Sequence, residues 1–202
     1  SLQSQCLDPN EIRLFNLKHE STLIHQNVAK VNTKLREAET VDPIFSKVVE
    51  AVEEKMDQFE NVVVPNISED KQVSLGLTAK KLSESEKQLV AVLTEAVAEK
   101  NTEDYGRIAT ESSQLYGQII FEVGNILRQS TDPAINDKLS NIVKDLGETT
   151  ARAVVALKQG TKSGEQEVIG RTKVTQAIKD FGIVFENLEE VKKELGGEML
   201  RK

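Results

Sequence analysis

The sequence predicts an all-α protein, built as an elongated up-and-down antiparallel bundle of five to six long helices. Asp-Pro pairs stand at positions 8–9, 42–43 and 132–133, each at the head of a long amphipathic stretch, and Pro65 stands in a break between two such stretches. Asp is a good N-cap, and proline at the first helical position gives up only an N–H that a helix leaves without a partner. The composition agrees, because 4% aromatic residues and no Trp among 202 residues suit helices around an aliphatic core.

The first two helices are expected over residues 9–38 and 43–60. Asp8 and Glu11 have the spacing of a capping box at the start of the first helix, and Asp42 is the expected N-cap of the second. In both stretches apolar residues recur at steps of three and four, which is the pattern of a helix with one buried face.

A break follows at residues 62–66, where three consecutive valines precede Pro65 and favour an extended backbone. We expect a buried crossover at this break, with an exposed apolar segment as the alternative. The third helix is expected over residues 68–99, with a bend or a loosening at its polar middle, residues 82–87.

The fourth helix is expected to begin after Thr102 and to run to about residue 129. Short loops between long helices make sequence neighbours antiparallel. Small residues on this helix permit close approach of another helix, at a cost in helix propensity. These residues are Ser112, Ser113, Gly117 and Gly124.

The last two helices are expected over residues 133–160 and 164–195. Gly160 is a suitable residue for the position after the fifth helix. Positions 163 and 166, a Ser and a Gln, have capping-box spacing at the start of the sixth helix, and the glycine pair at 196–197 is expected to end it.

The expected domain organisation is a flexible tail over residues 1–8, a helix pair over 9–62 and a four-helix portion over 66–197, packed together as one elongated domain. The chain begins with Ser1 and not with Met, so we expect a fragment of a larger protein. We expect a monomer or a weak dimer.

The charge and cysteine content narrow the class of protein. A net charge of −7 and a pI near 5.1 oppose non-specific nucleic-acid binding, which needs a basic surface, and weaken docking on anionic lipid. A single Cys allows no internal disulfide, which favours a reducing compartment. No signal peptide and no apolar run of membrane-spanning length is present. We therefore expect a cytoplasmic, cytoskeleton-associated protein without an integral membrane segment.

Motifs that carry catalysis or metal binding are absent from the sequence. It contains no Walker phosphate loop, no dinucleotide-binding glycine motif and no zinc-protease motif. The two histidines, His19 and His25, are six residues apart and lie about 120° from alignment on a helix, which is poor geometry for a shared metal. We expect no enzymatic activity, no cofactor and no metal site.

Basic residues on the fifth and sixth helices form the candidate partner-binding surface. Those of the fifth helix fall within about 120° of one another on a helical wheel, opposite the apolar stripe. The alternative is an ordinary solvated face with ion pairs. A basic face would instead favour an acidic polymer such as an actin filament, because complementary charge steers association. The candidate residues are Lys144, Arg152, Lys158, Lys162, Arg171 and Lys179.

The stretch STDPAINDKL, residues 130–139, resembles a helix junction of the vinculin/α-catenin family, with Ser130 in place of that family's cysteine. The segments 159–164 and 178–191 resemble the next loop and the last long helix of the same family. Residues 139–158, LSNIVKDLGETTARAVVALK, resemble the vinculin-binding helices of talin rod bundles. The resemblance covers residues 102–195 and implies a helical bundle of the cytoskeleton. The basic charge and the aromatic C-terminal arm of vinculin tails are absent from this chain.

The resemblance implies a non-enzymatic adaptor module of a cytoskeletal or cell-adhesion protein that binds F-actin or a partner helix. In one version a loosened bundle releases residues 133–160 into a groove of the partner. Two other classes stay open: a BAR-like membrane-associated helical dimer and a regulatory domain that binds a small GTPase.

Overall fold

The structure, a computed structural model, describes Ser21, Val28 and residues 43–63, 75–98 and 102–200. The chain divides into two compact units, residues 1–46 and residues 47–202, and the second contains nearly all of the described residues. The helix expected over 9–38 lies outside the described residues, apart from Ser21 and Val28, which are helical. The Asp8 and Asp42 caps and Pro65 also lie outside them. Of the break expected at 62–66, residues 62 and 63 are described, and the extended backbone expected there was wrong, because both belong to a π-helical turn that continues α2.

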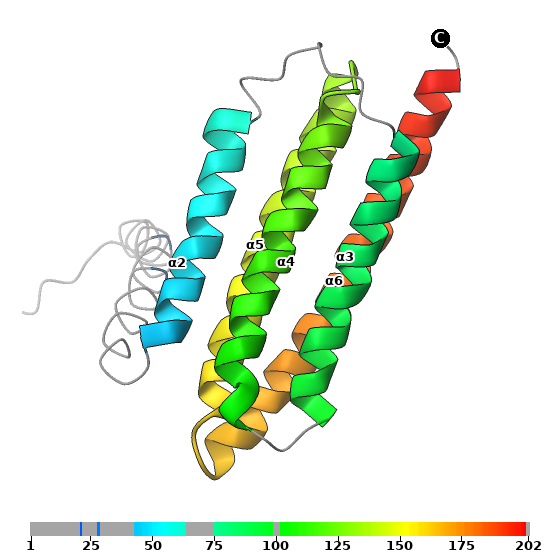
Figure 1. Ribbon diagram of the computed structural model, residues 1–202. Coiled ribbons are helices and arrows are strands. Elements are labelled where there is room, and N and C mark those ends of the chain that lie inside the picture. Colours follow the sequence, from blue (N-terminus) through cyan, green and yellow to red (C-terminus); the bar gives the residue numbers. More distant parts are fainter. Residues whose placement is uncertain (1–20, 22–27, 29–42, 64–74, 99–101, 201–202) are drawn as a thin grey trace, which may run out of the picture. The chain divides into compact units, whose positions relative to one another are not determined.

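The described part of the chain is all-α and contains no strand, as predicted. Five long helices account for most of it (Figure 1). In chain order the elements are α2 Pro43–Gln58, the π-helical turn η2 Phe59–Val63, α3 Leu75–Ala98, the 3-10 turn η3 Thr102–Asp104, α4 Tyr105–Leu127, α5 Pro133–Gly160 and α6 Glu165–Leu200.

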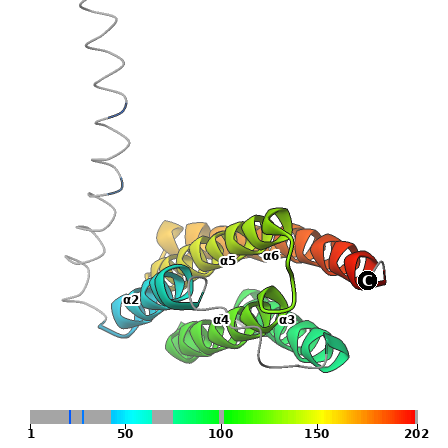
Figure 2. The ribbon, with the colours of Figure 1, turned by 90° about the horizontal axis from the view of Figure 1, so that it is seen from above.

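Four helices of the second unit, α3 to α6, form a closed ring in which each helix packs against two others. Helix α3 contacts α4 and α6, and α5 contacts the same two helices on the other side. Seen from above, α3 and α4 make one row and α5 and α6 the other (Figure 2). Neighbours in the ring run antiparallel, as the short connections predicted. Their shared core is aliphatic, and its fully buried members include Leu82, Leu89, Leu93, Ile108, Ile119, Val123, Leu139, Leu146, Leu157, Phe181 and Leu188.

Helix α2 contacts the ring through its C-terminal half. The Lys55 Nζ donates hydrogen bonds to the backbone oxygen of Ser113, at 2.9 Å, and to its Oγ, at 3.0 Å. At Gly147 of α5 an added Cβ would lie 2.1 Å from the Met56 Sδ. Gly147 of α5 therefore makes room for the Met56 side chain, while Ser113 of α4 accepts hydrogen bonds from Lys55.

Two tyrosines of α4 tie the helices of the ring together. The hydroxyl of Tyr105 donates to the backbone oxygen of Ala96 in α3, at 2.9 Å. The hydroxyl of Tyr116 donates to the backbone oxygen of Val143 in α5, at 3.1 Å. Both rings are fully buried, so each hydroxyl needs a partner inside the protein.

The polar stretch 82–87 does not interrupt α3, although we expected a bend or a loosening there. The helix runs without a break from Leu75 to Ala98. Leu82 is fully buried, and the Ser85 Oγ donates to the Gln118 side-chain oxygen of α4, at 3.4 Å. The expected weakness was wrong because this stretch packs against two neighbouring helices and does not face solvent alone.

Both bounds of α5 agree with prediction, whereas the two expected bounds of the sixth helix were wrong. The Asp132 Oδ1 accepts a hydrogen bond from the Ala134 N–H, at 2.9 Å, so Asp132 is the N-cap. Gly160 is the last helical residue of α5, and Thr161 follows it as the C-cap. Helix α6 begins at Glu165, directly after Gly164 and not after Ser163, and Gly164 makes the turn with a φ of 76°.

Helix α6 also runs through the glycine pair 196–197 to Leu200, where we expected it to end. Glycine lowers helix propensity by about 1 kcal/mol relative to alanine but keeps its N–H. The helical hydrogen bonds can therefore continue. Burial of Leu195 just before the pair helps to hold this turn against the bundle.

Candidate interaction groove along α4

The outer face of α4 carries two adjoining cavities, which we call together the α4 groove. The cavity toward α3 has a volume of about 480 Å³ and the cavity toward α2 about 240 Å³. Both are open to solvent and share Lys55, Gly117 and Phe121. The remaining lining residues are Lys81, Glu84, Ser85, Gln88, Gln114, Gln118 and Glu122 on the α3 side, and Gln58, Phe59, Ile120, Gly124 and Arg128 on the α2 side.

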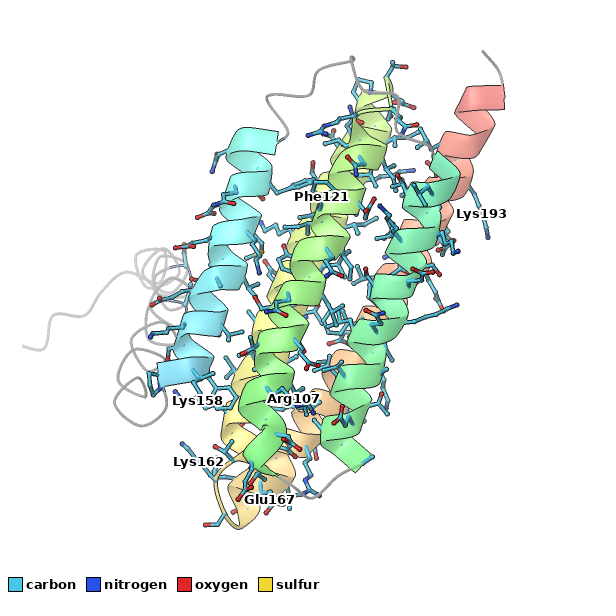
Figure 3. The ribbon with its side chains drawn as sticks, in the orientation of Figure 1. Arg107, Phe121, Lys158, Lys162, Glu167 and Lys193 are labelled. Atoms are coloured by element: carbon cyan, nitrogen blue, oxygen red, sulfur yellow. The ribbon has the colours of Figure 1, made fainter. Side chains whose placement is uncertain are left out.

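Phe121 is the exposed apolar group of the groove. Its side chain is 65% exposed and projects from the solvent face of α4, whereas Ile119 and Val123, two positions to either side, are fully buried (Figure 3). Isolated exposed apolar side chains are common. Phe121 differs from such a residue because it borders both cavities.

Gly117 lets a lysine of α2 lie across the groove. A Cβ added to Gly117 would lie 3.3 Å from the Lys55 Cε. The half-buried ammonium group of Lys55 donates hydrogen bonds to Ser113, and burial lowers the pKa of this lysine below its ordinary value. The groove thus contains a positioned cation that donates to the neutral oxygens of Ser113.

The two sides of the groove differ in charge. Lys55 and Arg128 line the α2 side, and no carboxylate is among the described residues that line it. On the α3 side Lys81 is balanced by Glu84 and Glu122. The α2 side therefore combines two cations with an apolar surface formed by Phe59, Ile120 and Phe121.

The predicted basic residues of α5 and α6 do not form one exposed set. Lys144, Lys162 and Lys179 are exposed. The Arg152 Nη1 lies 3.7 Å from the Asp180 Oδ2, and the Arg171 Nη2 lies 2.8 Å from the Glu167 Oε1. Two of the predicted residues thus take part in ion pairs within the protein.

Lys158 was predicted on the solvent face of α5, and this placement was wrong. Its side chain is buried, with 8% of the residue exposed, near the end of α5 that precedes Lys162 (Figure 3). Lys158 follows the fully buried Val154 by four residues and therefore lies on the same helical face. Helix α5 packs against more than one helix, so its buried face is wider than the apolar stripe suggested.

The described residues hold no group of three or more His, Cys, Asp or Glu side chains placed to bind a metal ion. Within the same residues, no helix has the length and apolar character needed to cross a membrane.

Comparisons of the chain with family models, with curated proteins and with solved structures found no match. The vinculin-like and talin-like character of residues 102–195 therefore stays an expectation from the sequence.

The α4 groove was not predicted from the sequence, although one signal for it was present. The apolar stripe of α4 runs through Ile119, Val123 and Ile126, and Phe121 lies off this stripe. An aromatic residue on the opposite face of an amphipathic helix indicates a contact outside the core of its own bundle. The role of Lys55 depends on which helix packs beside α4, and local spacing does not contain that information.

Proposed function

We propose that this chain is a non-enzymatic adaptor module of a cytoskeletal or adhesion protein, and that it binds an amphipathic helix of a partner protein in the α4 groove. The observation that carries the proposal is the exposed Phe121 ring between two open cavities. Helix-in-groove recognition uses apolar anchors of this kind, spaced by three and four residues on the partner helix.

The length and charge of the groove specify the partner helix. Its lining residues extend along α4 from Gln114 to the C-cap Arg128, which corresponds to about 20 Å at 1.5 Å per residue. About four turns of a partner helix fill this length. The partner should present an apolar stripe to Phe121 and Ile120 and carboxylates to Lys55 and Arg128, because complementary charge favours the correct partner and orientation.

Docking of a partner helix on the surface of the bundle costs less free energy than release of α5 into a partner. Helix α5 packs against both α4 and α6 and buries Leu139, Leu146 and Leu157 completely. Exposing a buried leucine costs about 1.5–3 kcal/mol. Release of α5 would expose several such side chains at once, whereas binding in the α4 groove leaves the ring intact.

The test uses two synthetic helical peptides of four turns, each with leucines along one face, one flanked by glutamates and the other by lysines. Fluorescence polarisation should show binding of the glutamate peptide with a Kd on the order of micromolar, and weaker binding of the lysine peptide. Phe121→Asp should weaken binding of the glutamate peptide by at least about tenfold, which corresponds to about 1.4 kcal/mol.

Val168→Asp is the matched control, since Val168 is also 65% exposed but lies on α6. This variant should bind the glutamate peptide as the unmodified chain does. Circular dichroism should show the same helix content for both variants, because neither side chain is in the core. Equal binding by both variants, or no binding of the glutamate peptide by the unmodified chain, would refute the proposal that the α4 groove binds a partner helix.

F-actin is the second candidate partner, favoured by the exposed Lys144, Lys162 and Lys179 on α5, α6 and the turn between them. The net charge of −7 opposes binding to an acidic filament. Under this candidate the unmodified chain pellets with filaments, and reversing the three lysines to glutamate abolishes pelleting while Phe121→Asp leaves it unchanged. Absence of pelleting by the unmodified chain would exclude it.

A further inference from the structure

A buried carboxylate lies where α3 meets α6. Glu86 of α3 is one of the few buried acidic residues among those described, and its side chain is only 10% exposed. The Lys192 Nζ of α6, with a side chain 13% exposed, lies 3.9 Å from the Glu86 Oε1. The Glu86 Oε1 accepts no hydrogen bond from the described residues.

The Lys192 ammonium group lies near two carboxylates, those of Glu86 and Glu189, and it is closer to Glu189. Its Nζ donates a hydrogen bond to the Glu189 Oε1, one turn earlier on α6. Glu189 is exposed, so this pair is partly solvated, whereas Glu86 faces the lysine only at the longer distance. The buried carboxylate therefore receives little of the compensation that a buried charge requires.

The charges around Glu86 shift its pKa in both directions. Burial raises the pKa of Glu86 to about 7, and repulsion from Glu189 adds to this effect, while attraction to Lys192 and Lys87 opposes it. Lys192 and Glu189 belong to α6, and Lys87 is the neighbour of Glu86 on α3. Among the described residues, α4, the other helix packed against α3, supplies none of the charges that act on Glu86.

We propose that the contact between α3 and α6 is a pH-sensitive seam, which is tight when Glu86 is protonated and weaker when Glu86 is ionised. Protonation of Glu86 removes a negative charge that is neither solvated nor closely paired at this contact. Lys192 remains paired with Glu189. Ionisation of Glu86 restores the buried negative charge, at a cost in desolvation free energy. This cost falls when α3 separates from α6 and water reaches the carboxylate.

The direction follows from the raised pKa. A carboxyl group with a higher pKa in the folded chain contributes stability below its ordinary pKa and loses this contribution as the pH rises through the folded value. For Glu86 the ordinary value is 4.5 and the folded value about 7. The seam should therefore weaken as the pH rises through neutrality.

The same helix forms one wall of the α4 groove, through Lys81, Glu84, Ser85 and Gln88. Loosening of α3 above neutral pH should therefore also weaken binding of a helix there. This consequence rests on the proposed function, whereas the pH-dependence of the seam does not, and the two are measured separately.

The test is urea denaturation of the full chain from about pH 6 to about pH 8, with Glu86→Gln as the variant. The folding equilibrium constant of the unmodified chain should fall by about tenfold more than that of Glu86→Gln over this range, as expected for one group that loses its proton there only in the folded chain. His19 and His25 are present in both proteins, so their titration cancels in the comparison.

Glu84→Gln is the matched control, because Glu84 is exposed on the same helix. This variant should follow the unmodified chain. Lys192→Met is a second variant: it removes an attraction that lowers the pKa of Glu86, so it should move the loss of stability to higher pH. An identical pH dependence in the unmodified chain and Glu86→Gln would overturn the proposal, as would a Glu84→Gln variant that abolishes it.

The place of the loosening is read from hydrogen exchange, corrected for the intrinsic effect of pH. Amides of α3 should lose protection between about pH 6 and about pH 8 in the unmodified chain and keep it in Glu86→Gln. Amides of α5 should change little. Loss of protection confined to α5 would place the pH sensitivity elsewhere and overturn the proposal.

Discussion

At the scale of single residues, hydrogen bonds from hydroxyl groups to the backbone allow Ser and Thr side chains to lie in an aliphatic core. Ser112 and Thr150 are fully buried, and each hydroxyl donates to the backbone oxygen four residues earlier in its own helix, both at 2.7 Å. Such bonds satisfy the hydroxyl without a partner from another helix. The tyrosine hydroxyls differ, because they reach across to a neighbouring helix and so contribute to the packing of the ring.

Tyr116→Phe tests this contribution. The variant keeps the buried ring but removes the hydrogen bond to the Val143 carbonyl, so we expect a loss of about 1 kcal/mol in the free energy of unfolding, measured by urea denaturation at neutral pH. Thr172→Val is a control, since the Thr172 hydroxyl is exposed and bonds only within α6. A Tyr116→Phe variant as stable as the unmodified chain would mean that the cross-helix bond adds nothing.

The same substitution has a signature at high pH. Burial, followed by repulsion from Glu60, raises the pKa of the Tyr116 hydroxyl above its ordinary value of 10.0. A raised pKa means that stability is present below the ordinary value and is lost as the pH rises above it. Alkaline unfolding should therefore be steeper in the unmodified chain than in Tyr116→Phe.

At the scale of elements, α5 and α6 make a close backbone contact where they cross at two glycines. A Cβ added to Gly170 would lie 2.4 Å from the Gly160 N and 2.8 Å from the Ala156 backbone oxygen. On its other side Gly160 faces the Tyr105 ring, at 2.8 Å from an added Cβ. The backbones of α5 and α6 thus touch directly, which only residues without a side chain allow.

Gly170→Ala should therefore destabilise the protein, although alanine is the better helix former. The neighbouring atoms are backbone and cannot rotate away, so we expect a loss of about 1–3 kcal/mol in the free energy of unfolding. Gly182→Ala on the same helix meets nothing within 4 Å and should raise stability by up to about 1 kcal/mol. Thermal denaturation of the two variants gives the comparison, and a stabilised Gly170→Ala would show that the helices can separate at no cost.

The bounds of α5 were predicted better than those of α6. The cap at Asp132 depends only on the chain around it, and its hydrogen bond is present as expected. Gly160 ends α5 as expected and also admits a close neighbour, the Tyr105 ring. The pair 196–197 does neither, because α6 runs through it to Leu200 and a Cβ added to either glycine would meet nothing within 4 Å, so that expected end was wrong.

At the scale of the whole molecule, the fold class was predictable and the candidate surfaces were only partly so. Periodicity and the absence of strand-forming runs indicated a bundle, because the buried face of each helix repeats along its own sequence. The exposed Lys144 and the buried Lys158 lie on one helix and look alike in sequence, yet the packing of α5 separates them. The groove around Phe121 and the burial of Glu86 both depend on helices that are distant in sequence, so local sequence did not reveal them.

The two tyrosines have a practical consequence, because the chain contains no Trp and no further Tyr. Its intrinsic ultraviolet fluorescence therefore comes almost wholly from Tyr105 and Tyr116, whose hydroxyls donate hydrogen bonds to α3 and α5 respectively. Substituting one tyrosine by phenylalanine leaves a single emitter at a known helix contact. The protein thus carries two native optical probes without any label: Tyr116 at the contact of α4 with α5, and Tyr105 where α4 meets both α3 and Gly160 of α5.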